Sequence, residues 1–276
     1  MKFTKMQGTG NDYIFIEDFD RRVMRPAVLA RAMCQHHFGV GADGLILILK
    51  SKIADFKMRI LNPDGSEAEM CGNGIRCLGK LVYERGLTRK KELAIETTSG
   101  ICDLRLLVRK GKVLRVEVNM GRPRLERKEI PILGEGSPVL AEPIRVLGKT
   151  FAASCLSMGN PHCVIFLKSL ASFAVERYGP AIENLPIFPQ RTNVEFVKVL
   201  NRGEVEMRVW ERGVRETQAC GTGAAAVVVA GALTGRTDRK IHIHLLGGDL
   251  RLNFRGDGCV YLTGAATVVF QGEWPQ

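Results

Sequence analysis

The fold follows from a short pattern that occurs twice in the chain. Cys71-Gly72-Asn73-Gly74 and Cys220-Gly221-Thr222-Gly223 have the same form, and their cysteines lie 149 positions apart. Other identities keep this offset without a gap: Gly10-Asn11 with Gly159-Asn160, Met58-Arg59 with Met207-Arg208, Glu67 with Glu216 and Gly86 with Gly235. A repeat of this length predicts two homologous domains rather than a solenoid.

Each copy also has the same order of predicted elements. Apolar or alternating runs with many β-branched residues come first and predict strands. They cover 13–16, 45–49 and 56–61 in the first copy, and 164–167, 193–199 and 205–210 in the second. A helix follows each cysteine motif, over 75–85 and 224–233, and a glycine ends each helix. The second helix is rich in alanine and valine, so we expect it to be buried on all sides.

These patterns predict an α+β fold of two pseudo-symmetric homologous domains, each a mixed β-sheet curled around a central helix. We expect an N-terminal domain over 1–118, to which a C-terminal strand over 266–276 returns, and a second domain over 119–265. Ligands commonly bind where two domains meet. We therefore expect the active site in the cleft between them.

The composition is that of an ordinary globular protein. Of the 276 residues, 45% are hydrophobic and 25% charged, which excludes disordered and coiled-coil classes. The longest apolar stretch, 224–233, is too short to cross a bilayer, and no export signal follows the N-terminus. We expect a cytoplasmic protein without a membrane partner. The net charge is +11, but the basic residues are scattered and no nucleic-acid-binding motif accompanies them. A solvated basic surface is favoured over a nucleic-acid partner.

The eight cysteines indicate neither a disulfide framework nor a metal centre. The chain contains no Cys-x-x-Cys pair, and five residues separate Cys71 from Cys77, which does not fit a zinc ribbon. Most of the thiols are expected to be small buried side chains. We therefore expect no metal ligands in this chain.

Cys71 and Cys220 differ from the others because each precedes a predicted helix. The positive end of the helix dipole there favours a thiolate and lowers the pKa of the thiol, and the glycines let an anion approach the backbone amides. The alternative is a cysteine cap beside a glycine turn. Because the cysteine motif occurs twice, at equivalent positions of the repeat, the interpretation as a functional site is favoured over that of a helix cap. Two thiols on opposite faces of a carbon next to a carboxylate would invert that carbon without a cofactor.

The sequence resembles the diaminopimelate epimerases over nearly its whole length. The resemblance rests on segments that occur in the order of the family: Gly8-Thr9-Gly10-Asn11-Asp12, Asn62-Pro63-Asp64-Gly65-Ser66, Cys71-Gly72-Asn73-Gly74-Ile75-Arg76-Cys77, Met158-Gly159-Asn160-Pro161-His162, Glu211-Arg212-Gly213 and Gln218-Ala219-Cys220-Gly221-Thr222-Gly223. Proline racemases resemble the chain only in Cys-Gly-x-Gly. The resemblance implies reversible conversion of L,L- to meso-diaminopimelate in lysine and peptidoglycan precursor synthesis, without cofactor or metal, by a homodimer.

The resemblance also implies a role for each matching residue. Cys71 is the base for the L,L substrate and Cys220 the base for the meso substrate. The remaining roles divide by the part of the substrate: Gly72, Asn73, Gly221 and Thr222 hold the α-carboxylate, Asn62, Asn193 and Arg212 the distal carboxylate, Glu211 the amino groups, and Asn11 and Asn160 complete the polar wall, with His162 in support.

Simpler interpretations exist for part of this set. Glu211 and Arg212 could form a surface ion pair, and Asn62 could be only a turn former. Gly44 departs from the family, because some members carry a ligand-contacting glutamine there. Water or backbone would then supply that contact.

Two other functions compete with this interpretation. One is a racemase of the same architecture with another substrate. Proline, however, has no distal carboxylate or amine for Glu211 and Arg212 to recognise. The other is a redox sensor in which Cys71 and Cys220 form a switchable pair, which leaves the paired glycines unexplained.

Overall fold

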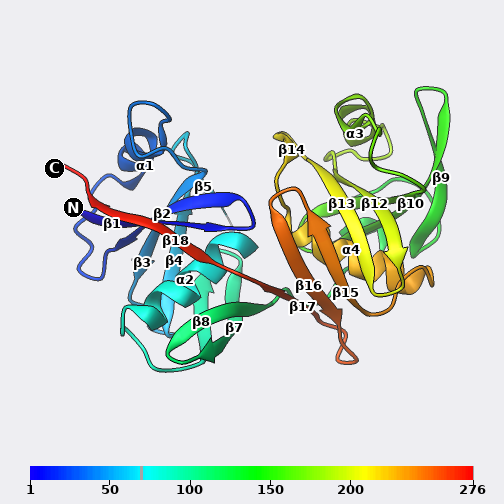
Figure 1. Cartoon of the computed structure of the whole chain (residues 1–276). Coiled ribbons are helices and arrows are strands. Elements are labelled where there is room, and N and C mark those ends of the chain that lie inside the picture. The colour runs from blue at the N-terminus through cyan, green and yellow to red at the C-terminus, as the bar shows by residue number, and fades with distance from the viewer. Residues whose placement is uncertain (69–70, 276) are drawn as a thin grey trace. The chain divides into compact units, whose positions relative to one another are not determined.

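The computed structural model describes residues 1–68 and 71–275. The chain divides into two compact units, Met1–Asn119 with Thr263–Gln276, and Met120–Leu262. Figure 1 shows each unit as strands that surround one helix. This confirms the predicted α+β class, with a mixed sheet in each half of the repeat.

The first unit contains two helices and nine strands among its described residues. The helices are α1 (Pro26–Cys34) and α2 (Gly72–Glu84), and the strands are β1 (Lys2–Gly8), β2 (Asn11–Glu17), β3 (Gly44–Leu49), β4 (Phe56–Leu61), β5 (Glu67–Ala68), β6 (Glu92–Thr97), β7 (Gly100–Arg109), β8 (Lys112–Asn119) and β18 (Thr267–Glu273). Pairing is parallel between β2 and β3 and between β4 and β6, and antiparallel between β1 and β2, β3 and β4, β6 and β7, and β7 and β8. Helix α2 packs against β1, β2, β7 and β8.

The second unit repeats this arrangement. Its elements are η1 (Arg127–Glu129), β9 (Val139–Val146), β10 (Lys149–Ser157), β11 (Pro161–Leu167), α3 (Val175–Glu183), β12 (Asn193–Asn201), β13 (Glu204–Glu211), β14 (Arg215–Thr217), α4 (Gly221–Leu233), β15 (Lys240–Leu245), β16 (Gly248–Phe254) and β17 (Val260–Gly264). Strand β11 pairs parallel with β12 and β13 with β15, as their counterparts do in the first unit. Both helix pairs, α1 with α3 and α2 with α4, keep the 149-residue offset at both ends.

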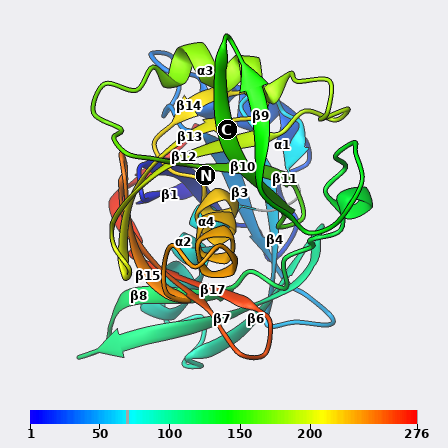
Figure 2. The ribbon, with the colours of Figure 1, turned by 90° about the vertical axis from the view of Figure 1, so that its right-hand side faces the viewer.

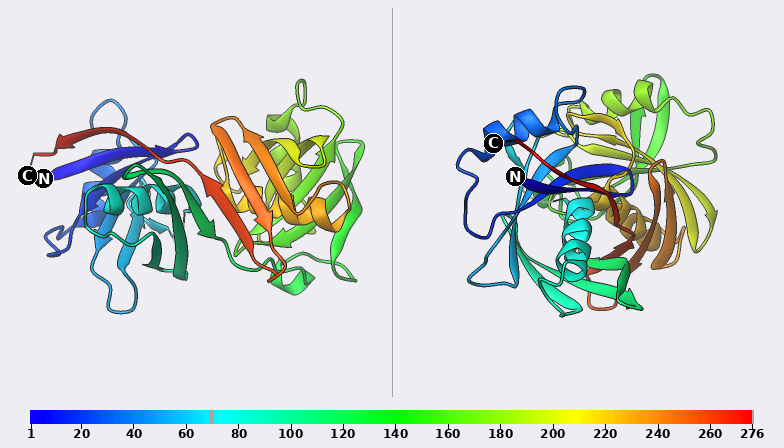
Figure 3. Two further views of the ribbon diagram at one scale, coloured as in Figure 1. Left: turned by 60° about the horizontal axis from the view of Figure 1, so that its bottom comes forward. Right: turned by 60° about the vertical axis from the view of Figure 1, so that its left-hand side comes forward.

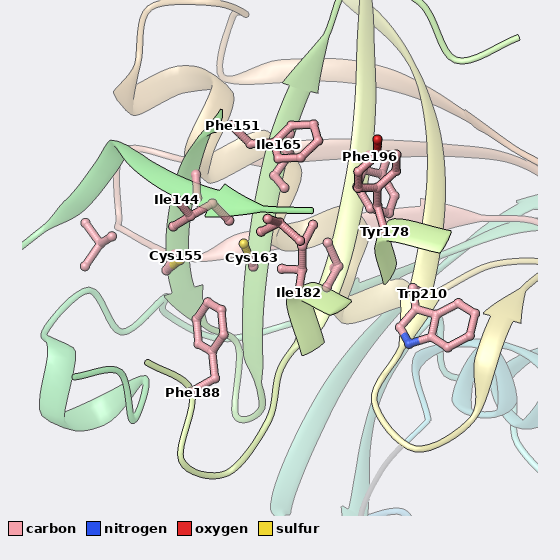
Figure 4. Packing of buried hydrophobic residues seen from close by; sticks show 14 of the residues in the cluster. Ile144, Phe151, Cys155, Cys163, Ile165, Tyr178, Ile182, Phe188, Phe196 and Trp210 are labelled. Carbon is pink, nitrogen blue, oxygen red and sulfur yellow. The ribbon is translucent and has the colours of Figure 1, made fainter. Parts of the chain in front are cut away.

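Helix α4 is enclosed as predicted. It is buried from Ala224 to Gly231 and packs against β10, β11, β12, β15 and β16. Figure 2 looks at this unit with α4 among those strands. A second layer lies on the other face of the sheet, where α3 covers β12 and β13. Figure 4 shows its packing, in which Phe151, Tyr178 and Phe196 fill the space between helix and sheet.

The outer strand beside the first strand of each repeat comes from a different part of the chain. In the second unit β9 precedes β10 and pairs with it antiparallel. In the first unit the same place beside β1 is taken by β18, at the C-terminal end of the chain. Figure 3 shows this red strand alongside the blue β1. The last strand therefore completes the sheet of the first unit.

Candidate active site

The two motif cysteines have the same local geometry. Cys71 is the N-cap of α2 and its Sγ accepts a hydrogen bond from the Gly74 amide at 3.4 Å. Cys220 is the N-cap of α4 and accepts from the Gly223 amide at the same distance. The helices therefore begin three residues earlier than the sequence predicted, with each sulfur at a helix N-terminus.

Each helix start presents two further amides. The N–H groups of Gly72 and Asn73, and those of Gly221 and Thr222, precede the first helical hydrogen bond, which Ile75 and Ala224 make to the cysteine carbonyls. Such amides have no partner within the helix and favour an anion. The residues expected to bind the α-carboxylate therefore lie beside the two sulfurs, within their own units.

The last glycine of each motif lets the helix start lie close to a strand. A Cβ at Gly74 would come within 2.7 Å of Ile46 Cδ1 on β3. A Cβ at Gly223 would come within 2.6 Å of Glu195 Oε1 on β12. Residues 46 and 195 are equivalent in the repeat. The same close approach thus brings an aliphatic side chain to α2 and a carboxylate to α4.

In the first unit a buried arginine holds the start of α2. Arg76 is fully buried and donates to Asn73 Oδ1 at 2.8 Å and to Thr9 Oγ1 at 2.6 Å. Asn73 in turn donates to Asn11 Oδ1, so two predicted substrate contacts form one network. Arg76 had no predicted role, although its motif was recognised. The signal in the sequence was that Arg76 is a cation within a motif expected to bind an anion.

Tyr13 is a second residue that the sequence interpretation missed. Its hydroxyl lies 2.9 Å from Cys71 Sγ. Burial, followed by the nearby charge of Cys71, raises the pKa of Tyr13 well above its ordinary value, so the phenol keeps its proton and can donate to the sulfur. Gly44 lies close to the neighbouring strand: a Cβ there would lie 2.9 Å from the Leu61 carbonyl oxygen and 3.4 Å from the Tyr13 ring. The Leu61 carbonyl therefore excludes a side chain at position 44 unless the backbone shifts.

In the second unit a chain of polar side chains leads to Cys220. The Thr222 hydroxyl lies 3.4 Å from Cys220 Sγ and accepts from Asn160 Nδ2 at 3.3 Å. Asn160 Oδ1 lies 2.9 Å from His162 Nε2. His162 Nδ1 then lies 2.7 Å from Glu195 Oε1. The expected residues Asn160, His162 and Thr222 therefore form one connected set.

Glu195 is the end of this chain, and it was not predicted. The side chains of His162 and Glu195 are both fully buried. The other carboxylate oxygen of Glu195, Oε2, has no hydrogen-bond partner among the described residues. A buried polar atom without a partner is costly and calls for an explanation in function.

The expectation of a lowered thiol pKa is wrong for Cys220. Burial, and then the negative charges of Glu211 and Glu195, raise the pKa of Cys220 well above its ordinary value. The Thr222 hydroxyl and the Gly223 amide act in the opposite direction but have smaller effects. The helix N-terminus does favour the thiolate, but desolvation and two carboxylates outweigh it. Cys220 is therefore a protonated thiol in the isolated chain.

The residues expected at the distal carboxylate fall into two groups. In the second unit the Arg212 amide donates to Asn193 Oδ1 at 2.9 Å, and Asn193 Nδ2 donates to the Pro161 carbonyl at 2.8 Å. Asn193 thus fixes the backbone of Arg212. The half-buried Arg212 guanidinium donates to the Gln190 carbonyl and pairs with no carboxylate among the described residues. The alternative interpretation, in which Glu211 and Arg212 form a surface ion pair with each other, is therefore not what the described residues show.

Glu211 and Asn62, which occupy equivalent repeat positions, have different surroundings. Glu211 accepts from the Thr217 hydroxyl, and burial raises the pKa of its carboxyl group. Asn62 lies in a turn, where its side chain donates to Ser66 Oγ at 2.9 Å. Its turn-forming role is real, and one N–H of its amide remains for a ligand.

Comparison with known proteins agrees with this geometry. A family model for diaminopimelate epimerase matches residues 3–126 and 154–269. The chain belongs to the diaminopimelate epimerase family. A diaminopimelate epimerase from Moorella thermoacetica is 54% identical over 100% of this chain and 99% of its own length. Those from Pelotomaculum thermopropionicum and Methanococcus maripaludis are 52% and 48% identical, over 99% of their lengths and at least 99% of this chain. Family membership makes this chain an isomerase.

Solved structures of lower identity share the fold. A phenazine biosynthesis protein of the PhzF family from Bacillus anthracis superposes with a TM-score of 0.73 at 16% identity, covering 100% of this chain and 99% of its own. A hydroxyproline epimerase from Agrobacterium vitis gives 0.70 at 16% identity, covering 99% and 90%. At these identities the likeness shows the architecture only. The fold of two pseudo-symmetric halves is therefore common to enzymes beyond this family.

Proposed function

We propose that this chain interconverts L,L- and meso-diaminopimelate by a two-base mechanism in which Cys71 and Cys220 act on opposite faces of one α-carbon. The observation that carries the proposal is the pair of N-cap cysteines at equivalent repeat positions, each beside two amides that can bind a carboxylate. The family relationship names the substrate. The reaction belongs to lysine biosynthesis and supplies a peptidoglycan precursor.

The proton transfers follow from the different surroundings of the two thiols. With L,L substrate, the Cys71 thiolate removes the α-proton, and the electron pair stays on the α-carbon next to a carboxylate held by helix amides. The Cys220 thiol then donates its proton to the other face and becomes a thiolate. With the meso substrate the roles reverse, so no external acid, base or cofactor is consumed.

Different neighbours stabilise the two sulfurs. The Tyr13 hydroxyl, 2.9 Å from Cys71 Sγ, donates to that sulfur when it is a thiolate. In the second unit, burial and then the negative charges of Glu211 and Glu195 raise the pKa of Cys220, so this thiol stays protonated until it reacts. Glu195 acts as a positioning residue: it orients His162, which orients Asn160 and through it Thr222.

Substrate selection rests on the groups that contact the distal end. Arg212 has a guanidinium without a carboxylate partner in the described chain, so it can pair bidentately with the distal carboxylate. Glu211 and Asn62 would contact an amino group and the carboxylate, and Asn11 and Asn160 would close the polar wall. Proline derivatives lack this distal end. We therefore expect no turnover of proline or hydroxyproline.

A direct assay tests the proposed substrate. Purified enzyme is incubated with L,L-diaminopimelate, and meso product is separated chromatographically, with L-proline and trans-4-hydroxy-L-proline in parallel. Formation of meso product alone supports the proposal. Turnover of a proline derivative with none of diaminopimelate would overturn it.

The proposal also includes a cytoplasmic homodimer. The reactive thiols require a reducing compartment, and all eight cysteines are unpaired. No described helix is long and apolar enough to cross a membrane. On β18 the apolar side chain of Val269 is 54% exposed, which suits a contact with a second copy. Light scattering on the purified protein should give twice the chain mass, and Val269→Lys should lower it.

A further inference from the structure

A group of histidines and carboxylates lies on three neighbouring strands of the second unit and has no part in the proposed reaction. His242 and His244 alternate along β15, so both side chains lie on one face of the sheet. Glu204 of β13 is the register partner of His242, and Asp249 of β16 is the partner of His244. The sheet register therefore gathers four potential metal ligands.

The atoms of these side chains are close enough to share one ion. His244 Nε2 lies 2.8 Å from Glu204 Oε1, and the ligand atoms of Glu204, His242 and His244 all lie within 4.8 Å of one another. The two imidazole rings are 4.6 Å apart between centroids. The three side chains are half-buried and can be reached from solvent.

We propose that Glu204, His242 and His244 bind a divalent transition metal ion of the Zn²⁺ type. Two imidazoles and one carboxylate are a ligand set that suits Zn²⁺, Co²⁺ or Ni²⁺ better than Mg²⁺ or Ca²⁺, which prefer oxygen ligands alone. Three protein ligands leave room for a water molecule. The sequence analysis expected no metal ligands in this chain, and the proposed site departs from that expectation.

Asp249 gives the site the support that metal-bound histidines usually have. Its Oδ1 lies 2.9 Å from His244 Nδ1. A carboxylate at one ring nitrogen fixes the tautomer and directs the lone pair of the other nitrogen outward. Here that other nitrogen, Nε2, is the one that faces Glu204. Asp249 also lies 3.1 Å from His242 Nε2 and can orient that ring.

Charges of both signs surround the three ligands. Glu206 is the register partner of His244, and Arg251 that of His242, so both belong to the same face. Lys198 pairs with Glu206 at 3.3 Å, so these two charges cancel. The negative charges that remain near the ligands are those of Glu204 and Asp249, and Arg251 is a positive charge beside them. Lys240 lies on the same face of β15 as the two histidines, so two carboxylates face two basic side chains before the ion binds. Arg251 should weaken the affinity without preventing binding.

The site is far from the proposed catalytic groups. Glu204 begins β13 and Glu211 ends it, seven residues later. At about 3.3 Å per residue the two ends are about 23 Å apart. The ion should therefore stabilise the second unit without altering epimerisation. The inference stands whether or not the proposed substrate is correct.

Cobalt binding to the full-length protein tests this inference, because Co²⁺ reports its ligands spectroscopically. Metal-free protein is titrated with Co²⁺ under reducing conditions. We expect one equivalent whose visible bands appear without the near-ultraviolet absorption of cobalt-thiolate bonds, and a higher Tm in its presence. Binding of this Co²⁺ ion should be lost in His242→Gln/His244→Gln, and its affinity should fall at least about tenfold in Glu204→Gln.

The other exposed histidines provide a matched control. His36→Gln/His37→Gln also removes two adjacent imidazoles and should retain the Co²⁺ equivalent. Circular dichroism and Tm without metal verify that each variant is folded. Two results would show that the cluster is a network of ion pairs only. In one, the wild-type protein binds no Co²⁺ apart from ions whose spectrum shows cobalt-thiolate bonds. In the other, the wild type and His242→Gln/His244→Gln bind Co²⁺ equally.

Discussion

His162 and Glu195 form a fully buried pair, with Nδ1 and Oε1 2.7 Å apart, directly beneath the start of the helix that carries Cys220. The equivalent residues of the first unit are Tyr13 and Ile46. The two halves thus share one backbone but differ beside the sulfurs: a tyrosine hydroxyl lies at Cys71, and a histidine–glutamate pair lies beneath the helix start of Cys220. This asymmetry suits a reaction in which one thiol starts protonated and the other does not.

Replacing Glu195 should impair the chemical step more than binding. In Glu195→Gln the amide keeps the shape but loses the charge that pairs with His162, so Asn160 and Thr222 lose their orientation. We expect kcat to fall at least about tenfold, or about 1.4 kcal/mol of barrier, with KM changed less than about twofold. The pH profile of kcat should also move, which a purely structural role would not cause.

Glu195→Ile serves as a second variant, because isoleucine is the residue of the first unit at this position. It should fold, and it should show the same loss of kcat. Normal kcat and an unchanged pH profile in both variants would rule out the positioning role.

The titration of Cys220 should respond to Glu211. A nearby negative charge disfavours the thiolate, and Glu211 is the larger of the two carboxylate contributions that raise the pKa of Cys220. Removing the charge in Glu211→Gln should therefore lower the pKa of Cys220, so that thiolate forms at lower pH. The rate of iodoacetamide alkylation of the Cys220 peptide, followed by mass spectrometry across pH, measures this shift.

Glu206→Gln is the control, since Glu206 lies on the same strand but pairs with Lys198. It should leave the alkylation profile of Cys220 unchanged. A profile that moves to higher pH in Glu211→Gln would contradict the sign of the effect.

Each motif cysteine should be indispensable, whereas the buried Cys77 near Cys71 should not be. Cys71→Ala and Cys220→Ala each remove one of the two proton carriers, so epimerisation should fall by at least about a hundredfold. Burial raises the pKa of Cys77 to about 12, which makes it inert as a base. Cys77→Ala should keep most activity. Near-normal turnover by either motif variant, with its fold verified by circular dichroism, would refute the two-base arrangement.

Arg212→Lys should weaken substrate binding. Lysine keeps the charge but cannot form the two parallel hydrogen bonds that a guanidinium makes to a carboxylate. We expect KM for diaminopimelate to rise about tenfold or more, or about 1.4 kcal/mol of binding. Alkylation of Cys220 should be unchanged in the same variant. An unaltered KM would mean that another residue anchors the distal carboxylate.

The sequence predicted the repeat, the class of fold and the position of both central helices because these depend on local patterns. Glycines set the helix ends, with φ of +73° at Gly86 and +68° at Gly235, and the apolar runs set the strands. The helices α1 and α3 were missed. Each has nine residues, and α3 contains Pro180. Helices this short depend on packing against the sheet more than on local propensity.

The site was predicted less completely than the fold. Cysteines and glycines could be found from the repeat, but Tyr13, Arg76 and Glu195 act through contacts between distant segments. Glu195 did leave a signal in the sequence, since it is the one charged residue in the run Val194–Val197. A charge in a buried strand must find a partner. The raised pKa of Cys220 could not be predicted, because it depends on burial and on carboxylates from β12 and β13.

Deuterium incorporation during a single conversion tests the two-base claim most directly. The enzyme is mixed with L,L-diaminopimelate in D₂O, and the reaction is stopped early for mass analysis of both isomers. Cys220 then carries deuterium from the solvent, while Cys71 carries the hydrogen taken from the substrate. The account predicts meso product with one deuterium at the inverted α-carbon and remaining L,L substrate with none. Meso product that retains the original hydrogen, or substrate labelled as fast as product, would show that a single base moves the proton and would contradict the account.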